Sequence, residues 1–137
     1  MRVVVIFFSG KNRDRLMNVA KALGRGIEKQ GNQVDVFDGV KDANVKLTMY
    51  QYVVIGAEPM GAFGGKIPQA VKPFLETAGM ASGKKSYAFV TRTAIGAERS
   101  LGALMKSMEH EGLYLKNSDV LRSAEEAEEI GRRLHVS

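Results

Sequence analysis

Cysteine is absent from this sequence of 137 residues. Disulfides, thiolate nucleophiles, iron–sulfur ligation and cysteine-bound zinc are therefore excluded. Histidine is scarce as well, because only His110 and His135 occur, far apart in the sequence. Both are expected to be solvated surface residues, so we predict no metal site. No other residue is a convincing general base or nucleophile, and the sequence therefore predicts no catalytic residue.

Long hydrophobic runs are also lacking. None approaches the ~20 apolar residues that a membrane-spanning helix needs. The chain enters a strand-like run directly at Arg2, without the small-residue cleavage site that ends a signal peptide. We therefore expect a cytoplasmic protein with no membrane partner.

Acidic residues are outnumbered, because 20 Lys and Arg stand against 15 Asp and Glu and give a formal net charge of +5. Such an excess favours acidic partners or anionic ligands. The basic residues are interspersed and no recognition motif accompanies them, so nucleic acid is not an expected partner. With 45% hydrophobic and 26% charged residues the composition is globular, and the length predicts a single domain over residues 1–137.

The stretch Arg2–Leu23 organises the rest of the chain. Its first part, Arg2–Phe8, is a near-continuous apolar run rich in β-branched residues, which is typical of a strand covered on both faces. A polar turn follows over residues 9–14. Apolar residues then recur at helical spacing from Leu16, within a helix expected over Asn12–Gln30. A buried strand, a loop at its carboxyl end and a helix make half of a βαβ unit, and open α/β sheets bind ligands at such loops.

Further segments repeat this alternation of strand and helix. Strands are expected at Gln33–Asp38, which alternates with period two as an edge strand does, at Tyr52–Gly56, at Ser86–Thr91, and in a short form from Leu113, with 120–121 extending it. Residues 39–48, including Ala43, stay open between a helical turn and an extended connection, and 81–85 are expected to form a turn. This alternation predicts a doubly wound parallel sheet of five strands, with helices on both faces and strand order 2-1-3-4-5.

Three helices are expected after the second strand. Ile67-Pro68 opens one, but Pro73 lacks the amide proton of an interior position and so predicts a kink or a later start. Leu101 to Met108 trace the apolar face of the next helix, which ends at Gly112. Ser123 and Glu126 have the spacing of a capping box and open the last helix.

Four segments carry a resemblance to the flavodoxin superfamily: Val3–Ser9, Tyr50–Gly56, Ile67–Glu76 and Gly83–Thr91. Their order and spacing resemble a short-chain flavodoxin, without the insertion that splits the fifth strand of long-chain members. The resemblance implies a flavodoxin-like fold. It also implies non-covalent binding of flavin mononucleotide (FMN), in three loops at the carboxyl ends of strands 1, 3 and 4, for electron transfer.

The first loop of that family, Ser-x-Thr-Gly-x-Thr, wraps the FMN phosphate at a helix N-terminus. Ser9 matches its first hydroxyl position, whereas Lys11, Asn12 and Asp14 stand where Thr, Gly and Thr are expected. Asp14 would bring a carboxylate towards a dianion, at a Coulomb cost.

Basic residues of the same loop offer compensation. Lys11, Arg13 and Arg15 provide direct charge pairing for a phosphate. The alternative is that these residues form a solvated basic turn and that the phosphate site has been lost. The sequence leaves the two interpretations open.

The second loop, Glu58–Gly65, has the length that the resemblance requires, and its glycines would let a peptide flip towards the flavin N5. Met60 or Phe63 would cover the isoalloxazine ring; alternatively, Phe63 closes the end of the sheet. The third loop, Thr91–Gly96, lacks the aromatic residue usual in the family, so Ile95 is the residue expected against a ring face.

The cofactor-binding residues that the resemblance implies come from all three loops. They are Ser9, Gly10, Lys11, Asn12, Arg13 and Asp14 in the first, Pro59, Met60, Gly61, Ala62, Phe63 and Gly64 in the second, and Thr91, Arg92, Thr93, Ile95 and Gly96 in the third. The loops carry six cations (Lys11, Arg13, Arg15, Lys66, Arg92, Arg99) against three anions (Asp14, Glu58, Glu98), a balance of +3. Such a crevice would receive an acidic redox partner protein or a phosphorylated small molecule.

Three functions are compatible with these features. The first is an FMN-binding electron-transfer protein, and the second is a cofactor-free flavodoxin-like module that binds a protein partner or an anion. The third is an FMN-dependent NAD(P)H:quinone or flavin reductase, an oxidoreductase in which Arg92 and Arg99 meet the nucleotide phosphates. A two-component receiver domain shares the strand order but needs a phosphate-accepting Asp after the third strand, where this chain has Gly56-Ala57-Glu58.

Overall fold

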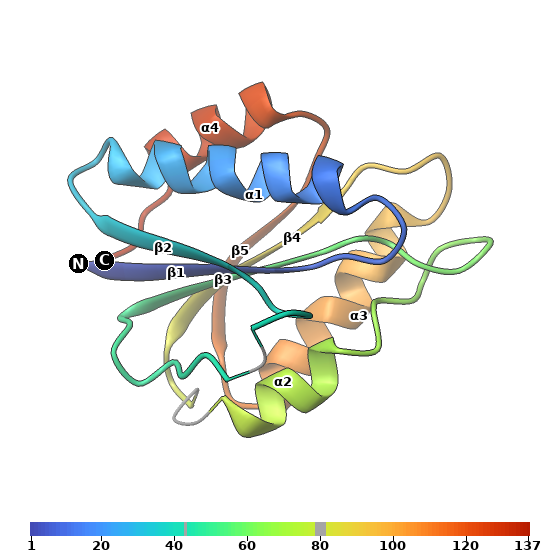
Figure 1. Ribbon diagram of the computed structural model, residues 1–137, viewed down its shortest axis with the longest axis horizontal. Helices are drawn as coiled ribbons and strands as arrows, with labels where there is room; N and C mark the ends of the chain where they lie inside the picture. The colour runs from blue at the N-terminus through green and yellow to red at the C-terminus, as the bar shows by residue number, and fades with distance from the viewer. Residues whose placement is uncertain (43, 79–81) are drawn as a thin grey trace.

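The computed structural model describes residues 1–42, 44–78 and 82–137, so the expectations that fall on Ala43 and Ala81 lie outside the described residues. Strands and helices alternate along the chain, as Figure 1 shows. The strands are β1 (Arg2–Phe8), β2 (Gln33–Asp38), β3 (Tyr52–Ala57), β4 (Lys85–Thr91) and β5 (Tyr114–Leu121). The helices are α1 (Arg13–Glu28), α2 (Val71–Thr77), α3 (Ala97–His110) and α4 (Ala124–Arg133).

The strands form one parallel sheet in the order β2-β1-β3-β4-β5, which confirms the predicted topology. The central strand pair β1–β3 runs without a register shift up to Phe8 beside Ala57. The residues that follow Phe8 and Ala57 therefore leave the sheet next to each other. This register decides which loops meet at the carboxyl edge.

Helices cover both faces of the sheet, with α1 and α4 on one face and α2 and α3 on the other (Figure 1). Because side chains alternate along a strand, Val3, Val5 and Phe7 lie in the core beneath α1 and α4. Val4, Ile6 and Phe8 lie in the core beneath α2 and α3. A strand buried on both faces needs an uninterrupted apolar sequence, which is the pattern of β1.

Pro73 predicted either a kinked helix or a helix that starts later, and helix α2 starts later. It begins at Val71 rather than at Ile67, so that Pro73 is its third residue. The first-turn amides of a helix have no partner within the helix, and proline therefore costs no hydrogen bond there. The later start was the second alternative.

The last strand and the last cap also differ from expectation. Strand β5 is eight residues long rather than short. Ser123 accepts the Glu126 amide at 3.1 Å, as a capping box requires. The reciprocal bond is not formed, because the Glu126 carboxylate accepts the Arg122 amide at 2.9 Å instead. Half of the predicted capping box is therefore wrong.

Two exclusions made from the sequence concern membranes and metals. Among residues 1–42, 44–78 and 82–137, no helix is long and apolar enough to cross a bilayer. The same ranges contain no group of three or more His, Asp or Glu side chains placed to hold a metal ion. His110 and His135 are both exposed, as expected.

Helices α1 and α4 approach each other through two glycines. A Cβ on Gly26 would lie 2.8 Å from the backbone nitrogen of Arg132 and closer still to the backbone oxygen of Glu128. A Cβ on Gly131 would lie 3.0 Å from the Gly26 Cα. Backbone cannot yield as a flexible side chain can, so the close crossing of these helices depends on both glycines.

We predict that Gly26→Ala lowers the free energy of unfolding by about 1–3 kcal/mol, because overpacking outweighs the better helix propensity of alanine. Gly102→Ala is the matched control, since Gly102 lies within α3 and a Cβ there would meet no atom within 4 Å. The control should raise the free energy of unfolding by roughly 0.5–1 kcal/mol. Urea denaturation measures both, and equal effects would contradict the helix contact.

Candidate functional site

The candidate site lies where the loops after β1, β3 and β4 meet at the carboxyl edge of the sheet (Figure 1). We call residues 9–12 the first loop, 58–66 the second and 92–96 the third. In parallel sheets this edge is where ligands bind, beside the strand at which the order reverses. Here that strand is β1, which has β2 on one side and β3 on the other.

The carboxylate of Glu58 occupies the centre of the first loop. One of its oxygens accepts the Gly10 amide at 3.0 Å and the Asn12 amide at 2.9 Å, and the other accepts the Lys11 amide at 2.8 Å. The residue is only 8% exposed. Successive amides at the amino end of a helix form an anion site. In this protein the anion of that site is a side chain of the chain itself.

The sheet register explains how Glu58 reaches the first loop. Phe8 pairs with Ala57, and the Glu58 amide continues that pairing by donating to the Phe8 carbonyl at 3.1 Å. Glu58 thus begins the second loop directly beside the residues that follow β1. The sequence interpretation counted Glu58 only as one of the loop anions. The signal that it missed was an acidic residue directly after the buried strand next to β1.

Met60 fills the remaining space between the first and second loops. A Cβ on Gly10 would collide with the Met60 Sδ and lie 2.7 Å from its methyl carbon, so the end of the Met60 side chain packs directly on Gly10. Met60 also pairs with Lys66 across an antiparallel bridge, in which its amide donates to the Lys66 carbonyl at 2.9 Å. The bridge folds residues 61–65 into a tight turn. Positive φ angles at Gly61, Gly64 and Gly65 account for the density of glycine there.

The second and third loops touch through their backbones. A Cβ on Gly64 would lie 2.5 Å from the Gly96 Cα, and the Arg99 guanidinium donates to the Phe63 carbonyl. The Ser100 hydroxyl is fully buried between them, where it accepts the Gly65 amide at 2.9 Å and donates to the Lys66 carbonyl at 2.8 Å. These contacts close the gap between the two loops.

Two of the crevice arginines point to partners elsewhere in the chain. Arg13 binds the Asp38 carboxylate at 2.7 Å, at the end of β2. Burial of Asp38 raises its pKa, but hydrogen bonds from Arg13 and from two backbone amides outweigh burial, and the pKa is lowered overall. Arg92 binds Glu98 at 2.7 Å. Arg13, one of the three residues predicted to compensate a phosphate, is thus paired with Asp38, whereas Lys11 and Arg15 take part in no ion pair among the described residues.

Three further predicted residues, Asn12, Asp14 and Thr93, contribute to the local structure of the first and third loops. The Asn12 side chain accepts the Arg15 amide at 3.3 Å and so caps α1. Asp14 is exposed in the first turn of that helix, where its charge suits the helix dipole. The Thr93 hydroxyl donates to the Ile95 carbonyl at 3.2 Å.

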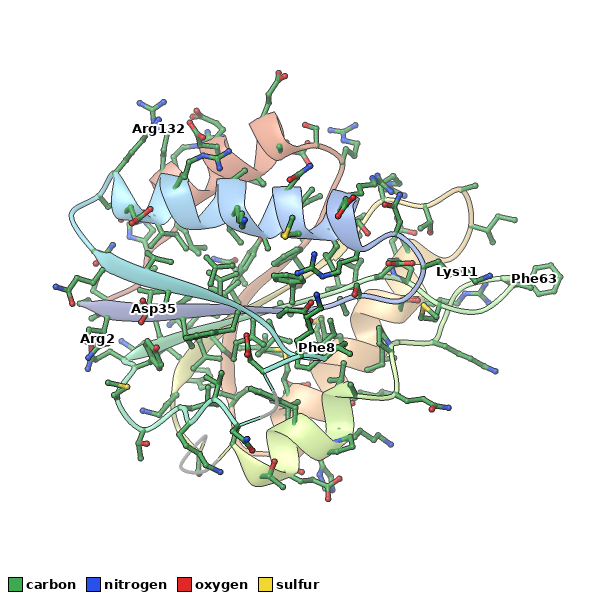
Figure 2. The ribbon with its side chains drawn as sticks, in the orientation of Figure 1. Arg2, Phe8, Lys11, Asp35, Phe63 and Arg132 are labelled. Atoms are coloured by element: carbon green, nitrogen blue, oxygen red, sulfur yellow. The ribbon has the colours of Figure 1, made fainter. Side chains whose placement is uncertain are left out.

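Four exposed residues of the loops and Arg99 from the first turn of α3 form a surface that we call the crevice rim: Lys11, Phe63, Lys66, Ile95 and Arg99. Phe63 is 70% exposed and Ile95 is 54% exposed. Figure 2 shows Phe63 at the tip of the second loop, directed away from the sheet. Lys11 and Lys66 take part in no ion pair within the part of the chain that the structure describes. The rim therefore combines apolar side chains with free positive charge.

Solved structures share this arrangement of strands and helices. Oxidised flavodoxin 1 from Bacillus cereus matches with a TM-score of 0.74 at 17% identity, over 96% of this chain and 95% of that one. Two-electron reduced flavodoxin from Megasphaera elsdenii matches with a TM-score of 0.75 at 16% identity, over 95% and 99%. The chain has the flavodoxin-like fold.

A flavodiiron core from Synechocystis contains the same flavodoxin-like arrangement as part of a longer protein. It matches with a TM-score of 0.73 at 15% identity, over 95% of this chain but 34% of that one. No protein-family model and no curated protein matches the sequence. At such low identities the structural likeness supports the flavodoxin-like fold and nothing finer.

We predict that Glu58→Ala exposes the amides of Gly10, Lys11 and Asn12, because it removes their common acceptor. Hydrogen exchange at these amides should accelerate, and the free energy of unfolding should fall by about 1–3 kcal/mol. Inorganic phosphate should raise the melting temperature of Glu58→Ala but not that of the wild type, because only the variant offers empty amides.

The matched control is Glu109→Ala, which removes an exposed carboxylate from α3 and should change the free energy of unfolding by less than about 0.5 kcal/mol. Unchanged exchange in Glu58→Ala would contradict the assignment of Glu58 as the acceptor.

Proposed function

We propose that this chain is a flavodoxin-like docking module that works without FMN and presents its crevice rim to an acidic protein partner. The observation that carries the proposal is the Glu58 carboxylate, which accepts all three amides of the first loop. A phosphate group would need those same amides.

Electrostatics supports a cofactor-free site. A phosphate at the first loop would have to displace a carboxylate that is 8% exposed, and the displaced charge would remain close by. Two like charges about 4 Å apart repel by about 4 kcal/mol near a protein surface. Of the three cations predicted to compensate a phosphate, Arg13 is already paired with Asp38, which leaves Lys11 and Arg15 without an ion pair among the described residues.

Steric contacts support the same conclusion at the ring position. In the arrangement that the family resemblance implies, the second and third loops cover the isoalloxazine ring. In this chain Gly64 and Gly96 are in backbone contact, and the Arg99 guanidinium donates a hydrogen bond to the Phe63 carbonyl. Phe63 is turned to solvent, where it cannot cover a ring lying between the loops.

The composition of the crevice rim supports an acidic partner. Lys11 and Lys66 are exposed and take part in no ion pair among the described residues, so their charges would steer an acidic surface. Phe63 and Ile95 supply apolar area, and exposed aromatic side chains of this kind become anchors of an interface. The partner would therefore be acidic and carry at least one apolar side chain.

The second candidate is FMN-dependent electron transfer, which the flavodoxin-like fold favours. It requires Glu58 to leave the first loop and the second and third loops to separate. An FMN-dependent reductase needs the same rearrangement. To bind nucleotide phosphates, Arg92 would also have to leave Glu98, and Arg99 would have to leave the Phe63 carbonyl.

Absorption and melting experiments distinguish these candidates. We predict that the purified protein has no flavin absorption and that excess FMN leaves its melting temperature unchanged. Binding of FMN at 100 times its Kd would instead stabilise the fold by about 2.7 kcal/mol. A yellow preparation, or oxidation of NAD(P)H with added FMN and a quinone, would replace the docking proposal with a flavin function.

A titration with short synthetic peptides tests the docking surface. A peptide of Glu and Leu should shift the amide resonances of Lys11, Phe63 and Ile95, whereas its Lys and Leu counterpart should not. Lys11→Glu and Phe63→Ser should each weaken binding, and added salt should weaken it further.

The matched controls are Lys85→Glu and Tyr114→Ser, which are exposed residues at the amino ends of β4 and β5, the opposite edge of the sheet. They should bind the acidic peptide as the wild type does. Equal binding of both peptides, or equal losses in rim and control variants, would contradict docking at the rim.

A further inference from the structure

We propose that a pocket between α2 and α3 binds a small amphipathic anion, a molecule with an apolar body and one anionic head group. The pocket has a volume of about 620 Å³. Small-molecule sites commonly measure about 300–1,000 Å³. It lies on the face of the sheet that α2 and α3 cover (Figure 1), and it shares one residue, Lys66, with the crevice rim.

The late start of α2 explains why the pocket exists. The helix spans only seven residues, Val71–Thr77, whereas its neighbour α3 spans fourteen, Ala97–His110. The irregular segment before α2 therefore lies beside the longer helix, and Ile67 and Lys66 become part of the wall.

The wall of the pocket is predominantly apolar. Ile67, Leu75 and Ala103 contribute hydrocarbon from the segment before α2, from α2 and from α3 respectively. A ligand body that removes this wall from water gains about 25 cal/mol for each Å² of apolar area buried. The body of the ligand is therefore expected to be apolar.

Positive charge surrounds this apolar wall. Lys66, Lys72 and Lys106 line the pocket, and none of them takes part in an ion pair among the described residues. Lysine side chains lay their methylene groups along apolar surface and keep the ammonium group in water, which places the charges at the rim of such a pocket. An anionic head group on an apolar body would meet this combination.

Acidic residues oppose the lysines only in part. Glu76 and Glu111 also line the pocket, which leaves one positive charge in excess when three lysines are set against two glutamates. Glu111 is in contact with the His110 ring at 3.0 Å, so part of its charge is directed at that residue. Ser107 contributes a hydroxyl as a neutral donor. The balance favours one anionic group and disfavours a cation.

Anilinonaphthalene sulfonate is a probe of this chemical class, and its neutral analogue phenylnaphthylamine lacks only the sulfonate. When the full chain is titrated with the anionic probe, the amide resonances of Leu75, Ala103 and Ser107 should shift. The neutral analogue should bind at least about tenfold more weakly. Equal affinity of the two probes, or shifts centred on Phe63 and Ile95, would overturn the proposal.

Two variants test the pocket from different sides. Lys72→Glu combined with Lys106→Glu reverses the exposed charge and should weaken binding of the anionic probe at least about tenfold. Ala103→Phe places a phenyl ring in the pocket and should weaken binding of both probes at least about tenfold. Unchanged affinity in either variant, with the melting temperature preserved, would overturn the proposal.

The matched control is Lys21→Glu combined with Lys85→Glu, which makes the same change in net charge at exposed positions outside the pocket. It should leave the affinity for the probe unchanged.

The result does not depend on the docking function, because Lys72, Ala103 and Lys106 lie outside the crevice rim. A crevice that binds no acidic peptide would leave the expected probe binding intact.

Discussion

One buried carboxylate organises the functional edge of this protein. Glu58 holds the amides of Gly10, Lys11 and Asn12 and so ties the loop after β1 to the loop after β3. Backbone amides at the amino end of α1 need an acceptor, and a carboxylate supplies one without any ligand. Met60 packs against Gly10 across the same two loops, and the contact of Gly64 with Gly96 joins the second loop to the third. The amides of the first loop are therefore satisfied within the chain.

The flavodoxin-like fold and the proposed function are compatible for this reason. A fold determines where loops meet, whereas the side chains of those loops determine what they bind. Here the same edge of the sheet that would receive a nucleotide carries an internal anion, exposed cations and an exposed aromatic ring. The pocket between α2 and α3 depends mainly on the length of α2, and it shares only Lys66 with the second loop.

Much of the architecture was predictable because it depends on local patterns. The apolar sequence of β1 follows from burial on two faces and agrees with the structure. Strand β2 lies at the edge of the sheet as predicted, but four of its residues in a row are half-buried and its burial does not alternate. Prediction failed at particular side-chain partners. The direction of Arg13 is set by Asp38 at the end of β2, a partner 25 residues away that spacing along the chain does not indicate. The second half of the expected capping box failed for a local reason, because Glu126 binds the amide of Arg122, four residues before it.

The sequence by itself determined the order of strands and helices, the absence of thiol chemistry and the positive charge of the crevice loops, because composition and periodicity are properties of the chain alone. Only the tertiary structure decided that Glu58 occupies the anion site, because this depends on the register that places Ala57 beside Phe8. The physical reason is distance: Glu58 and Lys11 are 47 residues apart in the chain but share a 2.8 Å hydrogen bond, and pairing between strands alone brings them together.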